Sequence, residues 1–465
     1  MYKVTVGLEV HAELKTNTKM FCACRNNADE HAPNVAVCPV CLAHPGTLPV
    51  INKEAVRKVL MVGKAVGGVL ADLTLFDRKN YFYPDIPKGY QISQYKHPLV
   101  SGGSLAGVAL TRIHLEEDTA RSQHPIRKQA SNGAGEGDRS LVDYNRAGVP
   151  LMELVTEPVI HTPEQAGVFA RELQLLLRTL GAGEANMEKG EMRVEANISV
   201  SKDENLGTKV EVKNLNSFRS VERAIAFEAA RQEALLESGG EVVQETRGWD
   251  EVSEQTFSQR KKESAHDYRY FPDPDLPSLR ISEIPDLTDI SLPELPSERR
   301  ARYVALGLKS DDADMFVTQP AAGGLFDAAI ESLAAGDSRI LTTANYVAND
   351  LAGNATAIEP QELALLIAML AEGKLSSRGA KDTLLGVLAG KGSVAEIAKD
   401  YLQESDEGAL LDIAKQVVEA HAGVAAEYKA GKESALQFLV GQGMKLSKGR
   451  GNPQALRAAI QKVLG

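Results

Sequence analysis

The chain opens with a stretch in which apolar and polar residues alternate. From Val4 to Leu14, even positions are aliphatic and odd positions are polar or glycine. A period of two is typical of a β-strand with one buried face, so the stretch predicts a half-buried strand. Glu9 and His11 share its polar face, where side chains two residues apart lie roughly 6.5–7 Å from each other. One ion held by both side chains is one interpretation, and a solvated outer face is the other.

Three later segments repeat the alternation and predict further strands over residues 108–121, 193–200 and 209–213. Their polar faces carry the candidate site residues Arg193, Glu195, Lys209 and Lys213. In the first of these strands Glu117 shares a face with apolar residues, where an uncompensated carboxylate is costly. Glu117 therefore needs a metal or another cation, a raised pKa, or a buried salt bridge to an arginine.

Capping signals predict helices at three places in the first part of the chain, beginning after Asn52, Thr162 and Ser217. From Phe271 onward prolines punctuate the sequence, and from Glu298 onward Ala-, Leu- and Glu-rich segments read as helices. We therefore predict a sheet-based domain over 1–293, a helical domain over 294–394 and a small helical tail over 395–465.

An aromatic-rich run spans residues 76–94 and includes Lys79, Tyr81 and Lys88. It shows neither alternation nor a helical face, so we interpret it as a loop whose side chains make contacts. A strand edge with aromatic packing is the alternative.

Bulk composition narrows the class of protein. A chain of 465 residues with 43% hydrophobic and 25% charged residues is typical of a soluble protein of two or three domains. No apolar run approaches the ~20 residues of a membrane span, and no signal-like segment precedes the first strand, so we expect a cytoplasmic protein. The net charge of -11 argues against a surface covered by nucleic acid but leaves room for a local basic patch. Lys445, Lys448 and Arg450 form such a patch near the C-terminus, which is either a solvated helix or a nucleic-acid contact.

All four cysteines lie in one short segment, as the pairs Cys22/Cys24 and Cys38/Cys41. Two close thiol pairs joined by a polar loop are typical of a structural zinc site with four thiolate ligands. A disulfide pair and a redox dithiol are the alternatives, and the expected cytoplasmic location disfavours the disulfide.

The polar strand faces also indicate a second metal site. Glu9, His11 and Glu195, with Glu117 nearby, would form an oxygen-rich ligand set that suits Mg²⁺ or Mn²⁺ better than Zn²⁺. No GxxxxGK[ST] motif occurs in the chain, so any ATP would bind without a P-loop.

Several longer motifs resemble the B subunits of the tRNA-dependent amidotransferases. They are Gly-Leu-Glu-Val-His at 7–11, Cys-Pro-Val-Cys at 38–41, the aromatic runs at 77–85 and 90–94, and the segments 141–146, 213–217, 267–272 and 438–442. The resemblance covers the whole chain. It implies an α+β fold with a glutamine-synthetase-like cradle on an antiparallel sheet, followed by all-α helical and tail domains.

The resemblance also implies a function. Glutamate on tRNA(Gln), or aspartate on tRNA(Asn), would be phosphorylated with ATP and then amidated by ammonia. It implies Mg²⁺ bound by Glu9, His11 and Glu117, and also by Glu195. Because the zinc pattern uses every cysteine, no thiol remains to release ammonia from glutamine. The family supplies ammonia through a tunnel from a separate amidase (A) subunit, and a small (C) subunit braces the pair.

Individual residues receive roles from the same resemblance. Lys79, Tyr81 and Lys88 match the mouth of the ammonia tunnel, and the basic tail with Lys445, Lys448 and Arg450 matches a tRNA grip. Phosphoryl transfer needs charge neutralisation more than covalent help, so Arg193, Lys209 and Lys213 are candidates for binding phosphates.

Two other classes of protein remain as alternatives. A non-catalytic RNA-binding module with a zinc site would account for the cysteines and the basic tail, but not for the acidic strand faces. A metal-dependent hydrolase would use the same acidic side chains without ATP.

Overall fold

The computed structural model describes residues 2–27, 30–123, 140–203, 205–261, 268–403, 407–447 and 452–465. The chain divides into two compact units, Met1–Leu295 and Pro296–Gly465. The first combines a large sheet with helices, and the second is helical in its described residues. This arrangement confirms the predicted α+β class, whereas a separate tail domain starting at 395 stays a prediction. Within the described residues, no helix has both the length and the apolar character needed to cross a membrane.

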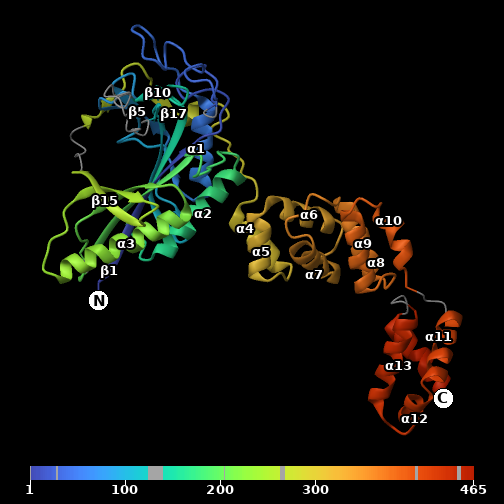
Figure 1. Ribbon diagram of the computed structural model, residues 1–465. Coiled ribbons are helices and arrows are strands. Elements are labelled where there is room, and N and C mark those ends of the chain that lie inside the picture. The colour runs from blue at the N-terminus through green and yellow to red at the C-terminus, as the bar shows by residue number, and fades with distance from the viewer. Residues whose placement is uncertain are drawn as a thin grey trace, which may run out of the picture. The chain divides into compact units, whose positions relative to one another are not determined.

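A ten-stranded sheet forms the centre of the first unit (Figure 1). The strands lie in the order β15-β14-β13-β12-β1-β11-β8-β6-β2, and β7 pairs with β8. Their bounds are β1 Lys3–Glu13, β2 Val69–Leu70, β6 Val100–Ser101, β7 Ser104–Leu105, β8 Val108–Glu117, β11 Pro150–Thr156, β12 Met192–Ser201, β13 Val210–Leu215, β14 Glu245–Asp250 and β15 Gln255–Lys261. Neighbouring strands are antiparallel except for β13 and β14, which are parallel.

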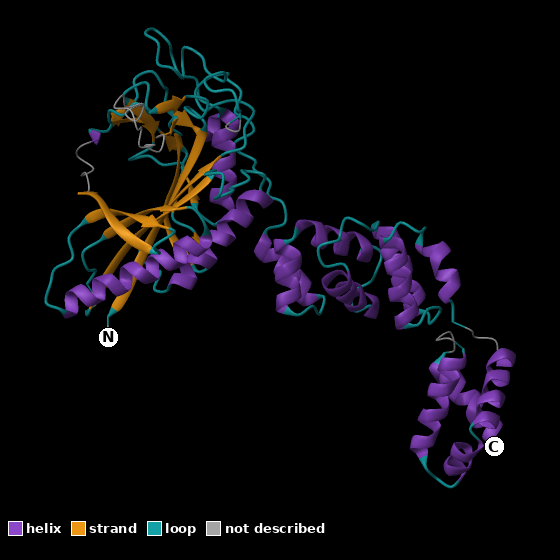
Figure 2. Ribbon diagram, in the orientation of Figure 1, coloured by secondary structure: helices purple, strands orange, loops and turns teal. Residues whose placement is uncertain are grey.

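Three helices bury the apolar face of this sheet (Figure 2). They are α1 Lys53–Ala65, α2 Pro163–Thr179 and α3 Phe218–Glu237, and the side chains of Asn52, Thr162 and Ser217 cap them as predicted. Val6, Leu8 and Val10 of β1 are fully buried against this helical layer. The intervening residues of β1 must therefore point to the opposite face, which keeps the polar side chains together.

The aromatic-rich run is not simply a loop. Strands β4 Asp77–Asn80, β5 Tyr90–Ser93 and β16 Phe271–Pro272 form a three-stranded sheet in the order β16-β4-β5. The loop interpretation is wrong for these residues, because β4 and β5 pair with each other inside the run. The distant β16 adds a third strand that local pattern does not reveal. The strand predicted over 108–121 is also shorter, since β8 ends at Glu117. The remaining short elements are β3 Leu73–Thr74, β9 Arg121–Gln123, β10 Leu141–Asp143, β17 Leu279–Arg280 and the 3₁₀ turn η2 Ile281–Glu283.

The second unit consists of short helices. They are α4 Pro296–Ala305, α5 Ser310–Thr318, α6 Pro320–Ile330, α7 Ser338–Asn345, η3 Tyr346–Asp350, α8 Pro360–Ala371, α9 Ser377–Leu388, α10 Val394–Ile397, η4 Ala398–Tyr401, α11 Glu407–Ala420, α12 Ala422–Lys429, α13 Glu433–Leu446 and α14 Pro453–Leu464. The last four share an apolar core that includes Leu410, Leu439 and Ile460.

Candidate active site and metal centres

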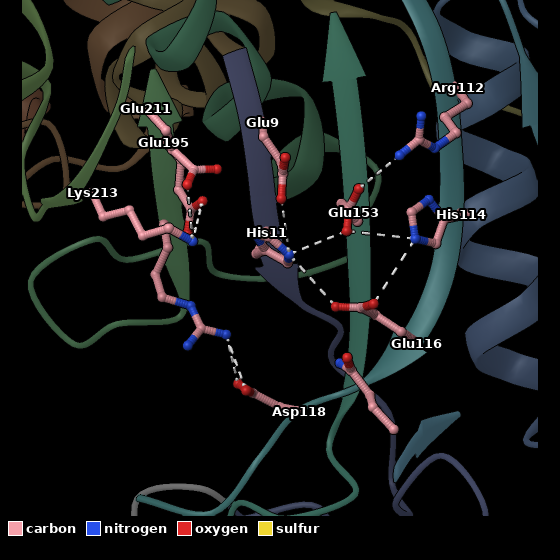
Figure 3. Close-up of polar contacts among 12 residues, drawn as sticks. Glu9, His11, Arg112, His114, Glu116, Asp118, Glu153, Glu195, Glu211 and Lys213 are labelled. Carbon is pink, nitrogen blue, oxygen red and sulfur yellow. Dashed lines mark hydrogen bonds and ion pairs between the residues drawn. The ribbon is translucent and has the colours of Figure 1, made fainter. Parts of the chain in front are cut away.

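Strand register brings acidic and imidazole side chains together on the polar face of the large sheet. His11 on β1 lies opposite Glu153 on β11, and Glu153 lies opposite His114 on β8. On the other side of β1, Glu9 lies opposite Glu195 on β12. Because paired residues point to the same face, strands far apart in sequence contribute to one site (Figure 3).

His11 lies at the centre of a group that we name the acid cluster: Glu9, His11, Glu116 and Glu153. The Nε2 atom of His11 is 3.3 Å from Oε2 of Glu153 and 3.5 Å from Oε1 of Glu116. The same atom is 3.9 Å from Oε1 of Glu9. Ligand atoms of Glu9, His11 and Glu153 lie within 4.8 Å of one another, close enough to share one ion. Two further groups meet the same distance: Glu9, Glu195 and Glu211, and His114, Glu116 and Glu153.

Negative charge is concentrated in the acid cluster. Burial, together with the charge of Glu153, raises the pKa of Glu9 to about 7. Burial alone would lower the pKa of His11, but hydrogen bonds to Glu116 and Glu153 outweigh it and raise this pKa well above 6.5. Within the described part of the chain, Oε2 of Glu116 is buried without a hydrogen-bond partner, which is costly unless a cation binds. Three carboxylates and one imidazole therefore fit Mg²⁺ or Mn²⁺.

Glu117 does not belong to this cluster. Side chains alternate along β8, so Glu116 shares the polar face with His114, and Glu117 points the other way. The Nζ atom of Lys88 lies 2.6 Å from Oε1 of Glu117 and 2.7 Å from its Oε2. The prediction that Glu117 converges with His11 on one ion is therefore wrong. A lysine, rather than the arginine considered above, compensates the buried Glu117 carboxylate.

The predicted phosphate-binding side chains lie at three different places. A guanidinium nitrogen of Arg193 lies 3.0 Å from both carboxylate oxygens of Asp118. The Nζ atom of Lys213 lies 2.8 Å from Oε2 of Glu195, because a bulge shifts the register between β12 and β13 beside that glutamate. Lys209 is exposed and directly precedes β13. Whether these groups bind phosphates stays a prediction.

The four cysteines also come together, in the segment between β1 and α1, and we name them the cysteine cluster. One sulfur from each of Cys22, Cys24, Cys38 and Cys41 lies within 4.8 Å of the others, and none of the four is in a disulfide. Hydrogen bonds from the Cys22 thiol and the Cys38 N–H, and the nearby Lys19 ammonium, lower the pKa of Cys41 to about 5. Because metals bind the thiolate form, the cluster fits a structural zinc ion.

The three residues matched to a tunnel mouth lie on or beside strands β4 and β5. Lys79 points its ammonium at the Tyr268 ring, 5.1 Å from the centroid, and the Tyr81 ring packs edge-on against the same residue. Lys88 borders a cavity of about 160 Å³ whose other walls include Cys22, Cys41 and Glu117.

The basic tail is described only in part. Lys445 is exposed near the end of α13. Lys448 and Arg450 lie outside the described residues.

Several residues of the site were missed by sequence reasoning, namely His114, Glu116, Asp118, Glu153 and Glu211. Glu153 interrupts the apolar run of β11 and is buried, which is the signal that could have identified it. Glu116 shares its parity with His114, so consistent use of the two-residue period would have selected it over Glu117.

Comparison with known proteins identifies the family of this chain. Residues 4–284 match the family described as GatB/GatE catalytic domain, and residues 329–464 match the GatB domain. The B subunit of the aspartyl/glutamyl-tRNA(Asn/Gln) amidotransferase of Thermus thermophilus is 43% identical over 482 residues, with 100% of both chains covered. The B subunits of Brevibacillus brevis and Bordetella parapertussis are 40% and 41% identical, over 100% of this chain and 99% and 100% of theirs. The chain therefore belongs to the family of B subunits of the aspartyl/glutamyl-tRNA(Asn/Gln) amidotransferases.

Proposed function

We propose that this chain is the ATP-dependent ligase subunit of an amidotransferase that acts on Glu-tRNA(Gln), Asp-tRNA(Asn) or both. The observation that carries the proposal is the acid cluster, in which three carboxylates surround His11 on the polar face of the large sheet. As a member of the B-subunit family it works with partner subunits. We propose an amidase (A) subunit and a small (C) subunit, acting in the cytoplasm, where translation takes place.

The reaction has two balanced steps. First, the side-chain carboxylate of the misacylated amino acid attacks the terminal phosphorus of ATP; an acyl phosphate forms and ADP leaves. Second, ammonia attacks the acyl carbon, the bond to the phosphate oxygen breaks, and the amide forms with loss of a proton. Phosphorylation is needed because a free carboxylate has no leaving group that ammonia can displace.

This chain supplies charge and position to those steps. Glu9, His11, Glu116 and Glu153 would hold Mg²⁺, with Glu195 beside them, and the ion would neutralise phosphate charge and polarise the transferring group. Arg193 on β12 and Lys213 on β13 are held in place by ion pairs with Asp118 and Glu195. We propose that they bind the phosphates together with Lys209.

The cysteine cluster would hold zinc in a structural role, since four protein ligands leave no position open for a reactant. The cavity beside Lys88 would form part of the ammonia path, and Lys79 and Tyr81 would border its exit. The exposed Lys445, with Lys448 and Arg450, would contact tRNA.

The proposal is tested by ATP-dependent conversion of Glu-tRNA and Asp-tRNA with ammonium chloride as nitrogen donor. We expect His11→Ala to lower the rate by roughly 100-fold or more, since it removes the centre of the metal site. Ser199→Ala is the matched control, because Ser199 lies on the same polar sheet face, opposite Thr5.

Other outcomes identify the other classes of protein. Turnover that needs no ATP would indicate the metal-dependent hydrolase. tRNA binding without turnover in either variant would indicate the zinc-containing RNA-binding module. Equal activity of His11→Ala and Ser199→Ala would rule out the acid cluster as the reaction centre.

A further inference from the structure

A pair of stacked tyrosines lies between the protein surface and the acid cluster. The rings of Tyr95 and Tyr270 stack with centroids 4.5 Å apart and planes 9° from parallel. Tyr95 follows β5, and Tyr270 directly precedes β16, so the three-stranded sheet presents both rings. Tyr95 is 47% exposed although Tyr270 covers one face of its ring, so solvent reaches the rest of this residue.

The segment that carries Tyr95 packs against the strand that carries Glu116. The Oε1 atom of Gln94, which directly precedes Tyr95, accepts a hydrogen bond of 3.0 Å from the N–H of Leu115. Leu115 directly precedes Glu116 on β8, so the stack lies beside the proposed reaction centre. Burial and, after it, the charges of Glu116 and Glu153 raise the pKa of Tyr270, which agrees with this placement.

The backbone residue between Tyr268 and Tyr270 is strained, and hydrogen bonds hold it in its conformation. Arg269 has a φ of 45°, in the left-handed region that a residue with a side chain rarely adopts. The side-chain amide of Asn80 donates to the carbonyl oxygens of Arg269, at 2.9 Å, and Tyr268, at 3.2 Å. These bonds fix the turn that directs Tyr268 and Tyr270 inward and leaves the Arg269 side chain exposed.

Two cationic residues are neighbours of the stacked tyrosines in the sequence. Arg269 directly precedes Tyr270, Lys96 directly follows Tyr95, and both are exposed. An exposed aromatic face flanked by cationic side chains is the usual arrangement for an unpaired nucleic-acid base and its phosphates. In a chain with a net charge of -11, such a local arrangement favours a phosphate-bearing ligand over an apolar protein surface.

We propose that the Tyr95–Tyr270 stack binds the unpaired 3′-terminal base of the aminoacyl-tRNA, and that Arg269 and Lys96 contact its phosphates. This inference rests on the proposed function, which requires the amino acid on the terminal ribose to reach the acid cluster. Only one ribose and one amino-acid side chain separate the terminal base from the carboxylate that reacts. The base must therefore lie close to the cluster, and the Tyr95–Tyr270 stack is an aromatic surface that leads there.

The test is a double-mutant cycle that combines protein variants with two forms of the tRNA. The measured quantity is the Kd of the tRNA for the full-length chain assembled with its partner subunits. The ligands are uncharged tRNA with its complete 3′ end and the same tRNA lacking the terminal nucleotide. In wild type, removing that nucleotide should raise Kd about 10-fold, the scale of one base–aromatic stack. Tyr95→Leu should raise Kd for complete tRNA by about the same factor, and in this variant removing the nucleotide should have little further effect.

Two further variants distinguish the contribution of ring stacking from that of side-chain volume and from that of positive charge. Tyr95→Phe keeps the ring, so it should bind like wild type, whereas leucine supplies apolar volume without an aromatic face. Arg269→Gly tolerates the left-handed backbone and removes the cation. It should reduce the slope of log Kd against log salt by about 0.7, which corresponds to one single-stranded phosphate contact.

Four results would overturn the inference. Tyr95→Leu with an unchanged Kd excludes the stack as a tRNA contact, and equal weakening of complete and shortened tRNA places the contact elsewhere on the tRNA. A raised KM for ATP with unchanged tRNA binding assigns the ring to the ATP adenine, and failure of Tyr95→Leu to assemble with the partner subunits assigns it to a protein interface. A wild-type complex that binds tRNA but consumes no ATP would instead refute the proposed function. The Kd measurements would still test whether the Tyr95–Tyr270 stack binds the terminal base.

Discussion

The acid cluster and the cysteine cluster are both candidate metal sites, but they are built on different scaffolds. The acid cluster lies on β1, β8 and β11, whose register is fixed by continuous antiparallel pairing. The cysteine cluster lies in irregular chain held by a few backbone hydrogen bonds, such as Lys19 N–H to the carbonyl of Cys24 and Met20 N–H to that of Gly148. Strand pairing defines the first geometry, whereas loop hydrogen bonds define the second.

Burial shows the same contrast. Leu8, Val10 and Ala12 of β1 are fully buried, so the strand behind the acid cluster is anchored in the main core. In the segment that carries the cysteines and leads to α1, Leu48 and Val50 are 63% and 71% exposed. Beyond Met20 and Phe21, which are buried in the main core, this segment needs another source of order, and four metal bonds would supply it. We therefore expect metal loss to abolish chemistry at one site and local order at the other.

The largest expected effect separates two neighbouring glutamates. Glu116→Gln removes a charged ligand from the acid cluster, so ammonium-dependent activity should fall by roughly 100-fold. Added Mg²⁺ should recover part of this activity, because the remaining ligands still bind the ion more weakly. The measurement is the Mg²⁺ concentration that gives half-maximal turnover.

Glu117→Gln is the matched control, since it makes the same change one residue along the same strand. It breaks the buried ion pair with Lys88, so it should lower the melting temperature. The Mg²⁺ concentration for half-maximal turnover should stay at the wild-type value. If Glu117→Gln shifts the Mg²⁺ requirement and Glu116→Gln does not, then Glu117, and not Glu116, belongs to the metal site.

The two clusters also differ in how far sequence reasoning could reach. Cysteine spacing is a local signal, so all four members of that group could be chosen from the printed residues alone. The acid cluster depends on which strands are neighbours, and β11, which supplies Glu153, was not predicted. Nor could the Lys88–Glu117 pair be deduced, because it joins β8 to the segment just before β5. Alternation indicates the polar face of each strand, but pairing across the sheet selects the residues that meet.

Removal of zinc should have an intermediate effect and act on stability. Stripping the complex with a strong chelator and then restoring Mg²⁺ should leave most of the ammonium-dependent activity. It should lower the melting temperature by roughly 4–8 °C, the scale of ~2 kcal/mol in a domain of this size. Limited proteolysis should then cut between Cys24 and Cys38.

His11→Ala, treated in the same way, tests whether the clusters are independent. On zinc removal, the melting temperature of this variant should fall by the same amount as that of the wild type, although the variant is already inactive. If zinc removal abolishes wild-type activity at saturating Mg²⁺, the cysteine cluster contributes to the chemistry and the contrast between the scaffolds is wrong.

The smallest expected effect concerns Asn52, which joins helix α1 to the cysteine-bearing segment. Its Oδ1 atom accepts hydrogen bonds from the N–H groups of Glu54 and Ala55, and its Nδ2 atom donates to the carbonyls of Thr18 and Lys19. Asn52→Asp keeps the helix cap but removes the donors, whereas Asn52→Ala removes both. Asn52→Ala should therefore lower the free energy of unfolding by about 1 kcal/mol, and Asn52→Asp should retain the capping contribution.

Zinc affinity distinguishes the two functions of this side chain. Both Asn52 variants should bind zinc several-fold more weakly, in a competition titration with a chromogenic chelator, because the segment before Cys22 is no longer tied to α1. Thr162→Ala is the matched control: it removes the cap of α2 and should lower the free energy of unfolding by a similar amount, with zinc affinity unchanged. Equal zinc affinity in all three variants would mean that the thiolates and the ion alone order this segment, which would make the contrast with the preorganised acid cluster still sharper.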